Sequence, residues 1–194
     1  MEDTIAAVAT TVGESSINVI RISGKDSINV VNRIFSKDIS KSLSHTVHYG
    51  FIMENGEKVD EVLLSVFKSP KTFTTEDIVE ISVHGGSTSV NKVMELVLSN
   101  GARLAEPGEF LKRAFLNGRI DLTQAEAVGD LISSQTESSR KMALKGVDKT
   151  IYRMVNELKE KVLALIANIE VNIDYPEYED AVLVTNDLII KTIN

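Results

Sequence analysis

The stretch DIVEISVHGG (residues 77–86) combines a strand pattern with the turn that ends it. Val79, Ile81 and Val83 recur at every second position, so they share one apolar face of a strand. Glu80 lies on the other face of the same strand. The two glycines then turn the chain into a segment with helical periodicity. A strand followed directly by a helix predicts a fold that mixes the two kinds of element.

The segments on either side of this stretch extend the pattern. Thr46–Met53 and Val59–Phe67 flank Asn55-Gly56, which is the strongest short signal for a hairpin. Three more strands are expected, over Thr4–Ala9, Asn18–Ser23 and Ala102–Ala105. Three helices are also expected. The first is capped by Asp26 and has Ile28, Val31, Ile34 and Phe35 at helical spacing, the second buries Val90, Val93, Met94, Val97 and Leu98, and the third is short and ends at Asn117-Gly118. Together they predict an α+β fold with a mixed or antiparallel sheet and helices.

The pattern becomes helical in the last part of the chain. Asp121 can cap a helix, and Gln124 three residues later completes a capping-box pattern. From there the helical pattern continues to Asp174, with a weak interruption at Ser133–Ser139. We therefore expect a segment of a long-helix bundle after the α+β part.

The last helix of this segment has a regular apolar seam. Its members begin with 4-3-4-3 spacing and continue in steps of four, which suits a partner helix: Ile151, Val155, Leu158, Val162, Leu165, Ile169 and Ile173. Tyr175-Pro176 is expected to end the helix. The change of pattern predicts two domains, residues 1–118 and residues 119–194.

Composition restricts the classes of function. The 194 residues include 21 basic and 28 acidic side chains, so a net charge of −7 gives no global attraction for nucleic acid. The first residues are acidic where a presequence is basic, and no apolar run approaches the ~18 residues of a membrane span. With no cysteine, a reducing, cytoplasmic setting without membrane association is the simplest interpretation.

The C-terminal end has two further features. Between Val162 and Ile190 there are six acidic residues and no Lys or Arg. Thr185–Asn194 has the pattern of a new amphipathic helix that stops without a cap. We therefore expect the chain to be a piece of a longer protein.

The sequence offers no clear metal or nucleophile site. His45 and His48 lie three positions apart along a predicted strand, so they face opposite sides and cannot chelate together. The third histidine, His84, has no carboxylate–histidine spacing around it. No G-x-x-x-x-G-K-[ST] string occurs, and a tight turn is favoured over an anion-binding turn at Gly85-Gly86. We expect neither a metal site nor a catalytic residue.

Two charged residues, Arg21 and Glu80, lie inside predicted strands. Charges there are costly unless they are paired or bind a ligand. The pattern alone favours one structural Arg–Glu pair, and the alternative is two ends of a polar ligand-binding site on a sheet face. The basic segment Phe110–Arg119 is too short and too close to acidic residues for a nucleic-acid patch, so a solvated helix face is expected.

The longest motif is PGEFLKRAFLNGRIDLTQAEA (residues 107–127), and it closely resembles the tRNA modification GTPase MnmE (TrmE) family. Three shorter motifs carry the same resemblance: DTIAA at 3–7, VIRISG at 19–24 and FTTEDIVEISVHGG at 73–86. The similarity extends from residue 3 to about residue 176.

This resemblance implies a particular domain organisation. Residues 1–118 are expected to form a domain similar to the folate-binding domains of aminomethyltransferases, and residues 119–194 the first part of a central helical domain. In the family a Ras-like GTPase domain, which uses GTP, Mg²⁺ and K⁺, is inserted into the helical domain, and a C-terminal segment carries a functional cysteine. The sequence contains neither a phosphate loop nor a cysteine, so this chain is not expected to be catalytic alone.

The resemblance also implies function. Family proteins act with MnmG on the wobble uridine of tRNA, form a homodimer through the N-terminal domain and bind a 5-formyl-tetrahydrofolate-type one-carbon donor. The folate contacts carry over to Arg21, Glu80 and Arg119, where Arg119 replaces a common lysine. Two other positions depart from the family: Thr10–Ser16 lacks the usual Pro/Gly-rich pattern, and Thr75 replaces a common glycine.

Two alternatives remain beside a folate-binding and dimerisation module. One is a structural dimerisation scaffold whose folate pocket is vestigial. The other is a stand-alone aminomethyltransferase-like enzyme, which the helical seam and the abrupt end disfavour.

Overall fold

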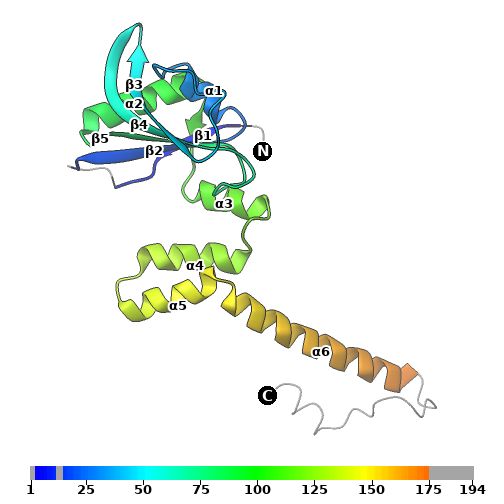
Figure 1. The fold of residues 1–194 in the computed structure, drawn as a ribbon. Helices are drawn as coiled ribbons and strands as arrows, with labels where there is room; N and C mark the ends of the chain where they lie inside the picture. The colour runs from blue at the N-terminus through cyan, green and yellow to red at the C-terminus, as the bar shows by residue number, and fades with distance from the viewer. Residues whose placement is uncertain (1–2, 12–14, 175–194) are drawn as a thin grey trace. The chain divides into compact units, whose positions relative to one another are not determined.

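The computed structural model describes residues 3–11 and 15–174. The chain divides into two compact units, Met1–Ile120 and Asp121–Asn194, and each is considered by itself (Figure 1). Three sequence-based expectations lie wholly or partly outside the described residues: the Thr10–Ser16 loop, the helix end at Tyr175-Pro176 and the helix at Thr185–Asn194.

The first unit contains a six-stranded sheet in the order β3-β4-β5-β2-β1-β6. Its strands are β1 (Ile5–Val8), β2 (Ile17–Ser23), β3 (Thr46–Glu54), β4 (Glu57–Phe67), β5 (Ile78–His84) and β6 (Arg103–Leu104). Neighbouring strands pair antiparallel except β1 and β6, which are parallel. The predicted α+β fold with a mixed sheet is confirmed.

Helices α1 (Ser27–Asn32) and α2 (Ser87–Ser99) cover one face of this sheet (Figure 1). The first unit also contains α3 (Glu109–Leu116). In Figure 1, α1 and α2 lie on one side of β2 and β5, and α3 lies on the other. Val31 of α1 and Val93 of α2 are fully buried against Ile22, Leu64 and Ile81 of the strands. Each such side chain contributes roughly 1.5–3 kcal/mol to stability through burial. The apolar core therefore lies on the face that α1 and α2 cover, and the opposite face, which carries Arg21 and Glu80, is the open face of the sheet.

The hairpin between β3 and β4 forms where the sequence predicts it. Asn55 and Gly56 both have positive φ, 50° and 87°. Two consecutive positive φ values are what a tight hairpin turn requires, and Asn-Gly adopts them at low cost.

Two details of the first unit differ from the sequence-based expectation. The side chain of Asp26 makes no capping hydrogen bond, and α1 ends at Asn32, before Ile34 and Phe35. These two residues are nevertheless buried, because Phe35 forms a β-bridge with Ile52 of β3. In α2, Leu96 rather than Leu98 completes the fully buried side.

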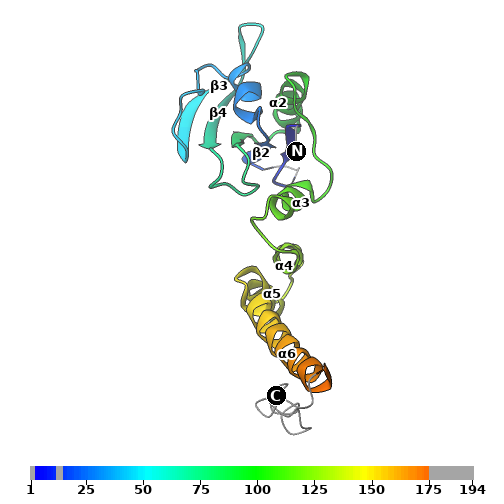
Figure 2. The ribbon, with the colours of Figure 1, turned by 90° about the vertical axis from the view of Figure 1, so that its right-hand side faces the viewer.

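The second unit consists of α4 (Leu122–Ser133), α5 (Glu137–Val147) and α6 (Thr150–Asp174), seen from two directions in Figures 1 and 2. The predicted capping box is confirmed: the Gln124 backbone N–H donates to Asp121 Oδ1 at 2.8 Å, and the Asp121 N–H donates to Gln124 Oε1 at 3.2 Å. The chain leaves the helical conformation between α4 and α5, within the predicted Ser/Thr interruption.

A second break, between α5 and α6, was not predicted. Lys149 has a φ of 66°, and the Asp148 carboxylate accepts from the Thr150 N–H at 3.0 Å. Lysine carries no turn signal, so helical periodicity runs through this position. The Asp-x-Thr spacing is the local pattern that could have indicated the new helix start.

The predicted seam of α6 is largely uncovered by the described residues. Val155 and Ile173 are 61% and 71% exposed, whereas Leu165 is buried. Within residues 3–11 and 15–174, no helix combines the length and apolar character needed to cross a membrane.

Candidate ligand-binding site

The open face of the sheet carries one charged pair at its centre. Arg21 on β2 and Glu80 on β5 are direct cross-strand partners. Arg21 Nε donates to Glu80 Oε1 at 2.7 Å, and Nη2 lies 2.7 Å from the same oxygen. The side chains are 30% and 25% exposed, so the pair is shielded from bulk water but still accessible.

The geometry leaves part of the Glu80 carboxylate available. Both arginine nitrogens converge on Oε1, and no hydrogen bond to Oε2 is present among the described residues. A carboxylate can accept several hydrogen bonds, about two at each oxygen. Glu80 can therefore accept from a bound molecule without losing its bond to Arg21.

Aromatic rings surround the charged pair. The Arg21 Cζ lies 5.5 Å from the centre of the Phe73 ring and 5.8 Å from that of Phe110. The Arg119 Cζ lies 5.0 Å from the same Phe73 ring. These are cation–π distances, so Phe73 lies in contact with two guanidinium groups.

A cavity of about 440 Å³ adjoins this cluster. Its walls combine charged and apolar side chains, and they are His45, Phe67, Pro70, Lys71, Thr72, Phe73, Ile78, Glu80 and Arg119. The volume lies in the range of small-molecule sites. The structure thus brings the three sequence-predicted site residues together: Glu80 and Arg119 line one cavity, and Arg21 binds Glu80.

Sequence reasoning missed several residues of this site. No sequence pattern marks Phe73, which contacts Arg21 and Arg119, or Phe67, which lies on the same open face of the sheet as Glu80. His45 was placed in a strand, whereas it precedes β3 with a φ of 63° and packs edge-to-face against Phe67 at 5.4 Å. A histidine at positive φ is uncommon, and no pattern in the sequence signals it.

The segment between β4 and β5 forms one wall and has an unusual backbone. Thr75 has a φ of 62°, in the left-handed region that a β-branched residue rarely adopts. Glycine, which the family resemblance predicts at this position, adopts such a φ at low cost.

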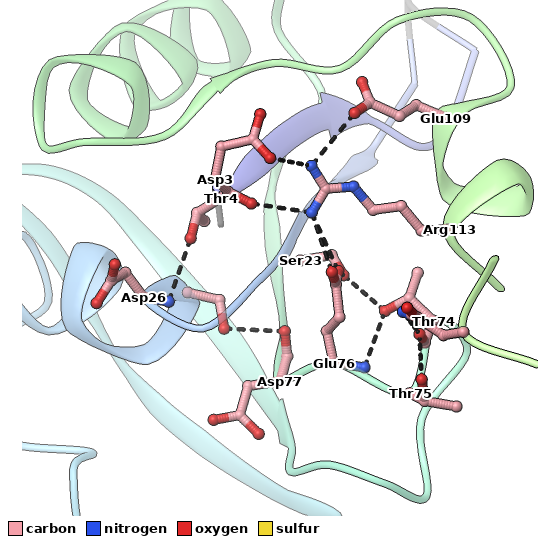
Figure 3. Close-up of polar contacts among 12 residues, drawn as sticks. Asp3, Thr4, Ser23, Asp26, Thr74, Thr75, Glu76, Asp77, Glu109 and Arg113 are labelled. Atoms are coloured by element: carbon pink, nitrogen blue, oxygen red, sulfur yellow. Dashed lines mark hydrogen bonds and ion pairs between the residues drawn. The ribbon is translucent and has the colours of Figure 1, made fainter. Parts of the chain in front are cut away.

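A cluster of charges surrounds the buried Arg113 side chain, and Figure 3 shows it; Glu109 is also buried, whereas Asp3 is about half exposed. Arg113 on α3 is 0% exposed, which corrects the expectation of a solvated basic face at this position. Its Nη2 lies 2.8 Å from Asp3 Oδ1 and 3.2 Å from Glu109 Oε1, and Nη1 lies 3.1 Å from Glu76 Oε1. Burying this cation is tolerated because three carboxylates surround it.

Arg103 completes the cluster from β6. Its Nη1 donates to Glu109 Oε2 at 2.8 Å. This interaction, reinforced by the Glu106 N–H and by Arg113, lowers the pKa of Glu109 to about 2. The hydrogen bond from Arg103 likewise lowers the pKa of Asp3. Both carboxylates are therefore ionised at neutral pH and hold the two arginines in place.

The turn after β5 needs glycine because the backbone of another segment approaches it closely. An added Cβ at Gly85 would lie 1.7 Å from the Ser15 carbonyl oxygen, so only glycine fits there.

His84, the last residue of β5, binds Asp60 of β4. Asp60 accepts the His84 N–H at 2.9 Å and contacts the ring Nδ1 at 2.6 Å, which raises the pKa of His84. Among the described residues, no three His, Cys, Asp or Glu side chains form a group able to hold a metal ion.

An α+β unit with a polar and aromatic cavity on the open face of its sheet is a candidate small-molecule-binding domain, and here a helical unit follows it in the chain. Residues 4–119 match the family model described as the N-terminus of GTP-binding protein TrmE, and residues 122–194 match the MnmE helical domain. The chain therefore belongs to the MnmE (TrmE) family of tRNA modification GTPases, as its motifs predict.

Relatives in several bacteria support this assignment. The chain is 51% identical over 191 residues to the tRNA modification GTPase MnmE of Listeria welshimeri and 54% identical over 193 residues to that of Acholeplasma laidlawii. A third relative, from Streptococcus thermophilus, is 50% identical over 188 residues. These matches cover 96–98% of this chain but 41–43% of the relatives, so the chain spans about two fifths of their length.

Proposed function

We propose that this chain is the folate-binding and dimerisation part of a tRNA-modifying GTPase. Residues 1–118 form the folate-binding domain, and residues 119–194 form the first part of the helical domain. The observation that carries the proposal is the Arg21–Glu80 pair at the cavity on the open sheet face, with Phe73 and Arg119 beside it.

The chemistry of a reduced folate such as 5-formyl-tetrahydrofolate suits this site. A pterin presents adjacent N–H donors, which Glu80 Oε2 can accept. Its ring and the p-aminobenzoyl group are flat and can pack against the Phe73 and Phe110 rings. The glutamate carboxylates of the ligand can pair with Arg119, which is exposed at the cavity wall.

The wider role follows from the family. In the complete protein this module acts with MnmG in modification of C5 of the wobble uridine, U34, of tRNA in the cytoplasm. GTP, Mg²⁺ and K⁺ bind the GTPase domain, and the N-terminal domain forms the homodimer. The net charge of −7 supports a role in which tRNA is held mainly by other segments or by MnmG.

One alternative deserves a test, namely a dimerisation scaffold whose folate pocket is vestigial. The observation in its favour is that Arg21 and Glu80 bind each other directly, as a structural pair would. The two functions differ in one property, because only the first requires the carboxylate of Glu80 to bind a small molecule.

The experiment compares Glu80→Ala with Glu57→Ala, which removes an exposed carboxylate at the start of β4. We expect Glu80→Ala to abolish the heat of 5-formyl-tetrahydrofolate binding and to leave the sedimentation coefficient of the dimer unchanged. Glu57→Ala should bind as the wild type does. If Glu80→Ala lost dimerisation together with folate binding, the assignment of Glu80 to the folate site would be wrong.

A further inference from the structure

The aromatic wall of the site comes from two separate segments. Phe73 lies in the connection between β4 and β5, and Phe110 lies on α3. Both rings reach the Arg21 guanidinium, at 5.5 Å and 5.8 Å. The shape of the site therefore depends on what holds the connection and α3 together.

The buried side chain of Arg113 makes that link. From α3, its Nη1 donates to Glu76 Oε1 and Oε2 at 3.1 Å and 3.2 Å (Figure 3). A second bond joins the end of α3 to the same connection, because Asn117 Nδ2 donates to the Thr74 carbonyl oxygen at 2.7 Å. Thr74 and Glu76 lie one and three positions after Phe73, so both bonds act within three residues of the ring.

The same carboxylate is also fixed to the strand that carries Arg21. Ser23 Oγ donates to Glu76 Oε2 at 2.7 Å and lies 2.7 Å from Thr74 Oγ1. Ser23 follows Arg21 by two positions, so both side chains lie on one face of β2. Glu76 thus connects β2, the connection that bears Phe73, and α3.

We propose that Arg113 is a positioning residue of the folate site, which sets the Phe73 ring over Arg21 through Glu76 and does not touch the ligand. The inference rests on the proposed function, since it assigns a role in that same site. A planar guanidinium suits the task, because it binds Glu76 through one nitrogen and Asp3 and Glu109 through the other.

Arg103 provides a matched control within the same cluster. It also pairs with Asp3 and Glu109, but the structure shows no bond from Arg103 to Glu76 among the described residues. Loss of either arginine removes charge from the cluster. Only loss of Arg113 also removes the hydrogen bonds to Glu76, in the connection that carries Phe73.

The first measurement is calorimetric titration of 5-formyl-tetrahydrofolate into the 194-residue chain. Arg113→Met should weaken binding by about tenfold or more, and Arg103→Met by less than about twofold. Equal weakening by both variants would overturn the inference, because it would reduce Arg113 to a general contributor to stability. Glu76→Gln keeps the bond from Ser23 and should weaken binding in the same direction as Arg113→Met, which serves if the latter fails to fold.

The second measurement needs no ligand. The chain contains no tryptophan, so Phe73→Trp places a single reporter in the connection. In this background Arg113→Met or Glu76→Gln should shift the emission to longer wavelength and lower its anisotropy, and Arg103→Met should leave both unchanged. Unchanged emission in Arg113→Met and Glu76→Gln would overturn the positioning role, whereas absence of folate binding by the wild type would contradict the proposed function instead.

Discussion

Arg21 and Glu80 are direct partners across the antiparallel strands β2 and β5, joined by a 2.7 Å hydrogen bond on the open face of the sheet. A charged pair there is conspicuous because the other face of the same strands carries the apolar core. The pair borders a cavity and keeps one carboxylate oxygen available, which is the arrangement that a ligand site needs and a purely structural pair does not.

The contribution of this pair to stability should be small. Both side chains retain about a quarter or more of their exposure, so solvent screens the interaction. A double-mutant cycle with Arg21→Met and Glu80→Gln, measured by urea unfolding without ligand, should give a coupling below about 1 kcal/mol. A coupling above about 3 kcal/mol would favour the scaffold, in which the pair is structural.

Arg119 should tolerate lysine but not alanine. Lysine keeps the charge at the cavity wall and loses the planar fork, so Arg119→Lys should change folate affinity by less than about fivefold. Arg119→Ala should weaken it by about tenfold or more, because the proposed ion pair with the ligand is lost. Calorimetry gives both values, and Arg140→Ala in α5 provides an exposed arginine outside the site as control. Full affinity in Arg119→Ala would remove this residue from the site.

Glu109 should give the first unit part of its resistance to acid. Arg103 lowers the pKa of Glu109 from 4.5 to about 2, so the folded state binds a proton less readily than the unfolded state. The stabilisation is complete above the unfolded pKa and is lost as the pH falls from about 4.5 towards about 2.

The corresponding measurement is urea unfolding of the wild type and Glu109→Gln over a series of pH values. The variant should be less stable at neutral pH. The difference in free energy of unfolding between the two proteins should shrink below pH 4.5, where protonation of Glu109 removes the stabilisation that its ionised carboxylate gives the wild type. A difference that stays constant across this range would contradict the predicted contribution of the ion pairs.

Thr75→Gly should stabilise the chain modestly. The φ of 62° strains a β-branched residue, and relief of this strain is worth roughly 1–2 kcal/mol. The gain is offset in part by the greater freedom of glycine in the unfolded state. We therefore expect a higher midpoint of thermal unfolding, by a few degrees at most. A lower midpoint would show that the hydrogen bond from Thr75 Oγ1 to the Thr74 carbonyl outweighs the strain.

Much of the fold could be predicted because its signals are local. Alternation in DIVEISVH gives the strand and places Glu80 on the face opposite the core, as β5 confirms. The Asn55-Gly56 turn and the Asp121–Gln124 capping box are equally local, since each depends on residues within a few positions of one another.

The charge cluster around the buried Arg113 could not be predicted in this way. Arg113 lies in a basic, amphipathic segment, and its partners Asp3 and Glu76 are 110 and 37 positions away. Only the fold brings them together, so a local pattern indicates a solvated arginine. For the same reason the proximity of Phe73, Phe110 and Arg119 to Arg21 appears only in three dimensions, while the role of these residues in folate binding stays a prediction.

Calorimetric titration of 5-formyl-tetrahydrofolate into the unmodified chain tests folate binding by this domain most directly. We expect saturable binding with a stoichiometry near one molecule per chain, since each chain carries one Arg21–Glu80 pair beside its cavity. Absence of any heat of binding at several temperatures would contradict it and leave a dimerisation scaffold as the function of this module.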